Sequence, residues 1–195
     1  EDRVCCRYCL DHFFMGNNYP SPQAWQPQLG QAETDNDVLI PNSSDLWENN
    51  IQYPLSGNVV GDQPKVSIKR VTYSHDVMHT KAMNFIRENA ARPFFLQAHY
   101  TIPHTNNEGG RATGDGQEVP DYGIYSDRDW PNPEKGYAAM ITRLDSDIGR
   151  MMALLKELAL DENTILFFTS DNGPHQEGGH KMEYFNSNGE LRGYK

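Results

Sequence analysis

A histidine that follows a proline forms the first candidate site. Residues 99–104 begin with His99 and end in Pro103 and His104, directly after an apolar run. A proline-stiffened turn can hold an imidazole so that one ring nitrogen faces a ligand while the backbone fixes the ring. Its placement alone does not decide whether His104 contacts a ligand or is a surface residue. His99, beside the apolar run, is predicted to be structural.

A carboxylate and an amide stand side by side in the second candidate site. Asp171 and Asn172 follow another apolar run and precede Gly173 and Pro174, which turn the chain away. Two neighbouring oxygen donors suit a hard divalent cation. The same residues are also typical of an ordinary turn, so both interpretations stay open at this point. The next residue, His175, is expected either to line a pocket mouth or to lie on the loop surface.

A glycine-rich polar stretch, residues 176–193, leads to the last candidate residue, Lys195. Glycines let a backbone approach an anion closely, and a lysine supplies a point positive charge. A terminal lysine is normally solvated. Its position in the order of the segments nevertheless makes Lys195 a candidate ligand for an anion.

The first elements that must position these residues are a helix and a strand. Residues 19–69 lack a period and are expected to form loops and short strands. Apolar residues at helical spacing after Ser74 predict a helix that ends near residues 92–93. Residues 94–98 then have the composition of a short buried strand.

A second helix and strand follow a long aperiodic stretch. Residues 105–131 show no period and are expected to form a lid, a substrate loop or an insertion. A helix is predicted from Asn132 to Leu158, with Pro133 at its first position. Its apolar face is expected to consist of Met140, Ile141, Leu144, Ile148, Met151, Leu155 and Leu158. Residues 164–169 are β-branched and aromatic, which favours a strand buried on both faces.

This order of elements predicts the fold class. Helix, strand, long loop, helix and strand are typical of an α/β three-layer sandwich with a mainly parallel central sheet. Open α/β sheets bind ligands just beyond the carboxyl ends of their strands. Since both polar clusters follow a predicted strand, we expect them to belong to one site.

Four segments of the chain, in this order, resemble the sulfatase family of the alkaline phosphatase superfamily. They are residues 101–104, 134–145, 170–175 and 191–195. The likeness covers about residues 70–195, and a looser likeness lies near residues 10–20. It implies an alkaline-phosphatase-like, incomplete version of the sandwich, in which residues 1–195 form a partial catalytic domain with residues 1–9 as a ragged start.

The resemblance implies a role for each candidate residue. Asp171 and Asn172 would complete the shell of a calcium ion, and His104 and Lys195 would grip the sulfate of a small-molecule or glycan ester. A divalent ion, a lysine and an imidazolium together disperse the charge of a transferring sulfuryl group. His104 could also protonate the departing alcohol oxygen. The implied reaction is hydrolysis of sulfate monoesters in a periplasmic, secreted or lysosomal enzyme.

The family's nucleophile motif is not in this chain. Sulfatases resemble one another around Cys-x-Pro-Ser-Arg or its serine variant, whose first residue becomes formylglycine, and the residues after Cys5, Cys6 and Cys9 do not match it. The paired aspartates that give the other half of the calcium shell, and an upstream lysine and histidine, are also missing. We therefore interpret the chain as an internal fragment that is expected to be inactive alone.

Composition excludes several other classes of protein. The chain has 195 residues, with 17 Lys+Arg, 27 Asp+Glu and a formal net charge of −10, so a broad nucleic-acid surface is not expected. Its apolar runs are far shorter than the roughly 20 residues of a membrane helix. The three cysteines are odd in number and clustered near one end, so they cannot cross-link the fold through disulfides. They are interpreted as ordinary thiols.

Three alternatives remain. A phosphodiester or phosphonate hydrolase of the same superfamily would keep the fold, although such enzymes generally have a fuller metal shell. A pseudoenzyme module would have lost the nucleophile altogether. His75 and His79 form an i, i+4 pair that superficially resembles the zinc-protease motif, but Asp76 replaces its glutamate and no third ligand is evident.

Overall fold

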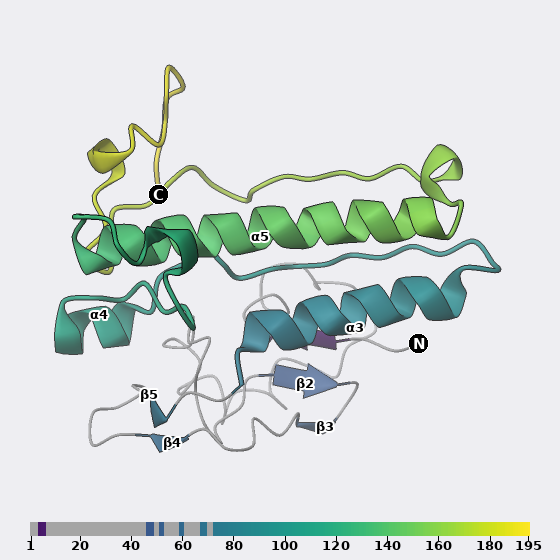
Figure 1. The fold of residues 1–195 in the computed structure, drawn as a ribbon, viewed down its shortest axis with the longest axis horizontal. Coiled ribbons are helices and arrows are strands. Elements are labelled where there is room, and N and C mark those ends of the chain that lie inside the picture. The colour runs from purple at the N-terminus through teal and green to yellow at the C-terminus, as the bar shows by residue number, and fades with distance from the viewer. Residues whose placement is uncertain (1–3, 7–45, 49–50, 53–58, 61–66, 70–71) are drawn as a thin grey trace, which may run out of the picture.

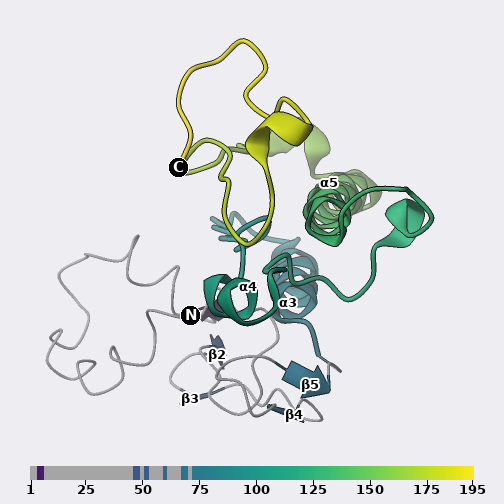
Figure 2. The same ribbon diagram turned by 90° about the vertical axis from the view of Figure 1, so that its left-hand side faces the viewer.

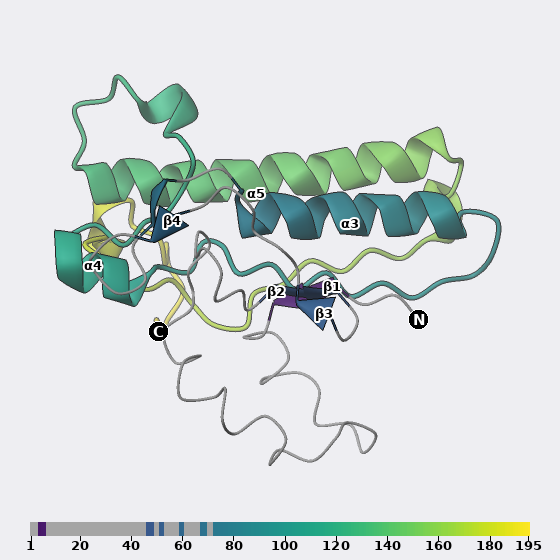
Figure 3. The same ribbon diagram turned by 90° about the horizontal axis from the view of Figure 1, so that it is seen from below.

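The computed structural model describes residues 4–6, 46–48, 51–52, 59–60, 67–69 and 72–195. Two long helices dominate this part of the chain, α3 (Ser74–Asn89) and α5 (Asn132–Glu157). They lie side by side, as Figure 1 and Figure 3 both show. Both predicted helices are therefore confirmed, and they provide the frame from which the candidate residues are held.

The helix α3 begins at Ser74, as predicted, and ends at Asn89, a few residues before the predicted break at residues 92–93. Tyr73, just before it, is extended, and Asp76 places a negative charge in the first turn, where the helix dipole favours one. Beyond Asn89 the side chain of Arg92 donates to the Asn89 amide oxygen, with nitrogen to oxygen distances of 2.8 and 2.6 Å. Pro93 follows and cannot continue a helix.

The helix α5 has a narrower buried face than the sequence predicts. Pro133 is the second residue of the helix, one position later than predicted, and Met140 is fully buried. The next residue, Ile141, is 42% exposed because one residue further along a helix turns the side chain by about 100°. Leu154, which the sequence pattern did not include, lies buried instead.

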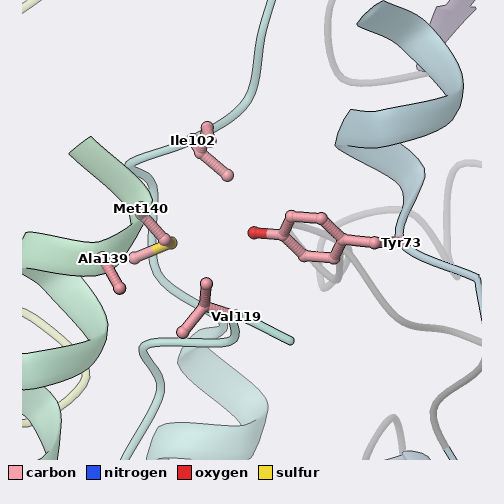
Figure 4. Packing of buried hydrophobic residues seen from close by; sticks show 5 residues of the cluster. All are labelled: Tyr73, Ile102, Val119, Ala139 and Met140. Carbon is pink, nitrogen blue, oxygen red and sulfur yellow. The ribbon is translucent and has the colours of Figure 1, made fainter. Parts of the chain in front are cut away.

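Two apolar clusters join the helices to the rest of the described chain. The first lies at the N-terminal ends of the helices, and Figure 4 shows its members: Tyr73, Ile102, Val119, Ala139 and Met140. The Tyr73 hydroxyl donates to the backbone oxygen of Glu118, 3.0 Å away. The second cluster lies further along and contains Ala82, Ile86, Met151, Leu154 and Leu155. The first cluster anchors the segment that leads to His104, because Ile102 is one of its members.

The described strands are short and antiparallel. One sheet has the order β1 (Val4–Cys6), β2 (Leu46–Glu48) and β3 (Ile51–Gln52), with Cys5 opposite Trp47. A second sheet pairs β4 (Val59–Val60) with β5 (Ser67–Lys69). Short strands within residues 19–69 are thus confirmed. Cys9 and most other residues of the first 71 lie outside the described part.

The two segments predicted as strands of a parallel sheet are extended but have no strand partner in the described chain. Residues 94–98 and 164–169 each follow a long helix and run back along the helix pair in the same direction (Figure 1). Phe94 and Leu96 pack against the second cluster while Phe95 is 80% exposed, which is the alternation of a strand. The return after each helix agrees with an α/β order, and the parallel sheet itself stays a prediction.

The predicted long loop contains regular structure, so that expectation was wrong in part. Residues 105–131 include the helix α4 (Asn107–Thr113) and the 3-10 turn η2 (Gly123–Tyr125). Further 3-10 turns are η3 (Asp161–Asn163) and η4 (Met182–Tyr184). The short α4 consists mainly of polar residues and glycines, so its sequence has no apolar periodicity from which a helix could be predicted. Among the described helices, none has the length and apolar character that crossing a bilayer requires.

Candidate functional site

The structure brings His104 and Lys195 into direct contact although 91 residues separate them in the chain. The Lys195 ammonium donates to the Nε2 atom of the His104 ring at 2.5 Å. The Lys195 side chain is 30% exposed, so the pair lies at the surface and is open to a ligand. An ammonium beside an imidazole is a suitable pair of groups for an oxyanion.

The tautomer of His104 follows from its second hydrogen bond. Its Nδ1–H donates to the backbone oxygen of Thr105 at 2.8 Å, because a carbonyl can only accept. The Nε2 atom is then the acceptor that faces Lys195. Burial lowers the pKa of His104, and the charge of Lys195 lowers it further against the opposing bond to Thr105. The imidazole is therefore neutral near pH 7 in this structure.

The backbone around Lys195 is held against the turn that follows Asp171 and Asn172. The Lys195 N–H donates to the backbone oxygen of Pro174 at 3.0 Å. Gly173 lies so close to Gly193 that an added Cβ would be 2.8 Å from its backbone oxygen. Only a residue without a side chain allows this approach. The two stretches that carry the candidate residues therefore lie side by side.

Asp171 and Asn172 are both exposed at the start of this turn. The Asn172 amide donates to the backbone oxygen of Gly173 at 2.8 Å, which leaves its side-chain oxygen available. Within the described part of the chain, no hydrogen bond or ion pair engages the Asp171 carboxylate. The two residues thus present two oxygen donors, the ligand type that Ca²⁺ prefers. They fit as part of a calcium shell, which takes six to eight oxygens in all.

His175, for which no specific role was expected, is a buried link between the two candidate segments. Its Nε2–H donates to the backbone oxygen of Pro103 at 3.1 Å, and its Nδ1 accepts from the Glu177 N–H at 3.1 Å. Its ring stacks near that of His104, with centroids 6.2 Å apart. Burial lowers the pKa of His175. Because both ring nitrogens are used, His175 positions other residues.

Glu177 and Gln117 were also missed by the sequence reasoning. The Glu177 carboxylate forms an ion pair with Lys195, with 3.2 Å between Oε2 and Nζ. The Gln117 amide donates to the backbone oxygens of Glu177 and Gly178 and to the Thr105 hydroxyl, at 2.9, 3.3 and 3.0 Å. Figure 2 shows the C-terminal stretch approaching α4 at this place. A short-range pattern cannot predict such contacts, since the partners are 60 and 61 residues apart.

The carboxylate of Glu134, on α5, holds the C-terminal stretch that contains Glu177 against this helix. Glu134 is 1% exposed, and its two oxygens accept from the His180 Nδ1–H at 2.6 Å and the Lys181 backbone N–H at 3.0 Å. The His180 ring stacks on Tyr137 with centroids 3.7 Å apart. Position in the first turn of the helix also favours the negative charge of Glu134. Both attachments hold the loop that carries His175 and Glu177.

The histidine pair considered for zinc forms a different, closed network. The His75 Nε2–H donates to Asp147 at 2.7 Å, and His79 Nε2 lies 3.7 Å from the other oxygen of the same carboxylate. Arg150 contacts that second oxygen as well, and its positive charge opposes a metal there. In the described residues, no three His, Cys, Asp or Glu side chains are arranged to hold a metal ion. Asp147 is thus a third group near the pair, but the arrangement is an ion-pair network.

Comparison with known proteins gives the family. The model of the sulfatase family matches residues 2–195, so this chain belongs to the sulfatase family. The chain is 32% identical to an N-acetylgalactosamine-6-O-sulfatase of Bacteroides thetaiotaomicron over 197 aligned residues, which cover 94% of the chain and 34% of that relative. It is also 32% identical to a steryl-sulfatase of Mus musculus over 59% of the chain and 16% of that relative.

A solved structure supports the fold. The crystal structure of Ps i-CgsB in complex with k-i-k-neocarrahexaose matches 85% of this chain and 32% of its own, with a TM-score of 0.51 and 22% identity. At that identity the likeness concerns the fold alone. The chain spans about a third of the length of the Bacteroides relative and of this structure. The resemblance noted in the sequence is therefore confirmed at the level of the family.

Proposed function

We propose that the complete protein hydrolyses sulfate monoesters and that this chain supplies part of its sulfate site and part of its calcium site. The observation that supports the proposal most strongly is the contact of the Lys195 ammonium with His104 Nε2. Two residues from distant parts of the chain meet at the surface with the chemistry of an anion site. Membership in a family of sulfuric ester hydrolases supports the reaction class.

The two side chains have different tasks in this proposal. Lys195 is a permanent cation and pairs with the sulfate oxygens. His104 is neutral without a ligand, because burial holds its pKa below the usual value. A sulfate bound beside Lys195 brings negative charge, which favours a proton on His104 Nε2. The imidazolium can then donate that proton to the departing alcohol oxygen.

Calcium and the nucleophile complete the proposal. Asp171 and Asn172 would hold Ca²⁺ with their side-chain oxygens, and both are exposed beside the stretch that carries Lys195. Bound there, the ion would add positive charge that stabilises the transferring group. A formylglycine nucleophile would come from a part of the protein outside this sequence, so this chain alone is proposed to be inactive. The substrate would be a glycan or small-molecule sulfate ester, and the location periplasmic, secreted or lysosomal.

Titration of the chain with inorganic sulfate tests the anion site. Isothermal titration calorimetry at pH 7 is expected to show that Lys195→Ala weakens sulfate binding by about tenfold or more, since a charge-assisted hydrogen bond is worth about 1.5–3 kcal/mol. Lys181→Ala is the matched control, because Lys181 is exposed in the same stretch and its backbone N–H, which the substitution keeps, makes its bond to Glu134. That control is expected to bind sulfate within twofold of the unchanged chain.

Two results would count against this proposal. Equal sulfate affinity in Lys195→Ala and the unchanged chain would remove Lys195 from the site. Tighter binding of inorganic phosphate than of sulfate, with the same dependence on Lys195, would favour the phosphodiester or phosphonate hydrolase instead.

A further inference from the structure

The carboxylate of Glu177 lies on the anion pair and has no role in the proposal above. Its Oε2 atom is 3.2 Å from the Lys195 Nζ atom. That oxygen is buried, and among the described residues it accepts no hydrogen bond. Its charge also acts on His104, whose pKa it raises against the larger effect of burial. A negative group therefore faces the place where a sulfate would bind.

The backbone of Glu177 is fixed from several sides. Its N–H donates to His175 Nδ1 at 3.1 Å, and its carbonyl oxygen accepts from the Gln117 amide at 2.9 Å and from the His180 N–H at 3.1 Å. The next residue, Gly178, has a φ of +58° and lies against the Thr105 hydroxyl, where a side chain would collide. The backbone of Glu177 is therefore held at the site by the fold, although the side chain is 38% exposed.

A carboxylate in this position discriminates among anions. Bare sulfate at Lys195 would be repelled by Glu177, since like charges at close range disfavour binding. The repulsion is offset where the ligand places a hydroxyl group beside its sulfate, because the hydroxyl can donate to the buried Oε2 atom. Among the described residues, the Lys195 ammonium is the partner of the Oε2 atom, and a ligand's sulfate would compete for that ammonium. A buried carboxylate oxygen that loses its partner is costly, so a ligand whose hydroxyl donates to it gains affinity.

We propose that Glu177 is a specificity-determining residue that selects sulfate esters with a free hydroxyl next to the sulfate, as in a sulfated sugar, over inorganic sulfate and aryl sulfates. The inference rests on the proposed sulfate site at His104 and Lys195. Glu177 would add to that site a residue that contacts the part of the substrate beyond the sulfate group.

Three ligands and one substitution test the inference. The affinities of the chain for glucose 3-sulfate, whose neighbouring carbons carry free hydroxyls, for phenyl sulfate and for inorganic sulfate are measured by calorimetry. The unchanged chain is expected to bind glucose 3-sulfate about tenfold more tightly than phenyl sulfate, the size expected of a hydrogen bond to a charged group. Glu177→Leu is expected to bring this ratio to about one, and to tighten the binding of inorganic sulfate.

A second variant and a control keep the test independent of folding. Glu177→Gln removes the charge but keeps the shape and an acceptor oxygen, so it is expected to tighten the binding of inorganic sulfate and to retain part of the preference for the sugar. Glu190→Gln removes a charge at an exposed position of the same stretch and is expected to change neither.

The outcomes separate the two proposals. Sulfate binding that depends on Lys195 but shows the same ligand ratio with and without Glu177 would overturn this inference alone. Absence of sulfate binding in every form of the chain would overturn the proposed function, and this inference with it.

Discussion

Two of the networks of histidine and carboxylate groups in the described residues differ in how deeply their groups are buried. Between α3 and α5, His75 and Asp147 are fully buried and Arg150 also contacts the carboxylate. At the other network, Lys195 and Glu177 remain 30% and 38% exposed. A network whose histidine and carboxylate are buried stabilises the fold, whereas a network with its cation and carboxylate at the surface can exchange partners with a ligand.

The largest effect is expected in the closed network. Asp147→Asn removes the negative charge that His75 and Arg150 share, and leaves a buried imidazole with a weaker partner. Breaking a buried pair by changing one partner costs about 3 kcal/mol, so the free energy of unfolding should fall by about that amount. Urea unfolding followed by circular dichroism measures the change.

The sulfate affinity of the Asp147→Asn variant is expected to stay unchanged. Where the variant remains folded, its affinity for inorganic sulfate should stay within twofold of the unchanged chain, since the substitution does not touch His104 or Lys195. A loss of sulfate affinity as large as that of Lys195→Ala would show that the two networks are not separate.

A smaller effect is expected from pH. Burial lowers the pKa of His79, His104 and His175, so below the ordinary histidine value of 6.5 the unfolded chain binds more protons than the folded one. Stability is therefore full above pH 6.5 and falls as the pH drops below it. For Asp147, burial opposes ionisation, but the bond from His75 and the nearby positive groups hold its pKa below 3.8.

The loss of stability that comes from protonation of Asp147 occurs at a lower pH than the loss that comes from the histidines. A lowered carboxyl pKa contributes stability that is present above the unfolded value of 3.8 and is lost as the pH falls through the folded value. Melting temperatures measured from pH 8 to pH 3 should fall in two steps, the first near 6.5 and the second below 3.8. Asp147→Asn should abolish the second step and, because the Asp147 charge raises the pKa of His79 against burial, enlarge the first. A stability that is flat with pH would contradict both assignments.

The sequence could predict the parts of the site that short-range patterns mark. The proline before His104 and the Asp171–Asn172 pair stand out by residue type, and the apolar period predicts α3 and α5. Lys195 became a candidate because it follows the other candidate segments in the order typical of the family. The structure brings His104 to Lys195 and places the Asp171–Asn172 turn beside the same stretch, whereas their roles stay proposals.

The remaining parts depend on contacts that no local pattern encodes. His175 and Gln117 contact backbone atoms of residues far along the chain, and Glu177 pairs with the side chain of Lys195. In the sequence these three polar residues therefore look like ordinary loop residues. The predicted strands at residues 94–98 and 164–169 have strand composition, but a sheet needs neighbouring strands. Within the described chain those neighbours are not present, and Phe167 is 87% exposed.

We infer that His104 and Lys195 bind one anion together, and a double-mutant cycle measures whether the two side chains act on the same ligand. Affinities for inorganic sulfate are measured for the unchanged chain, His104→Ala, Lys195→Ala and the double variant. If both groups contact the same anion, the double variant should lose less than the sum of the two single losses, with a coupling of about 0.5–3 kcal/mol. Losses that add to within about 0.3 kcal/mol would contradict a shared site.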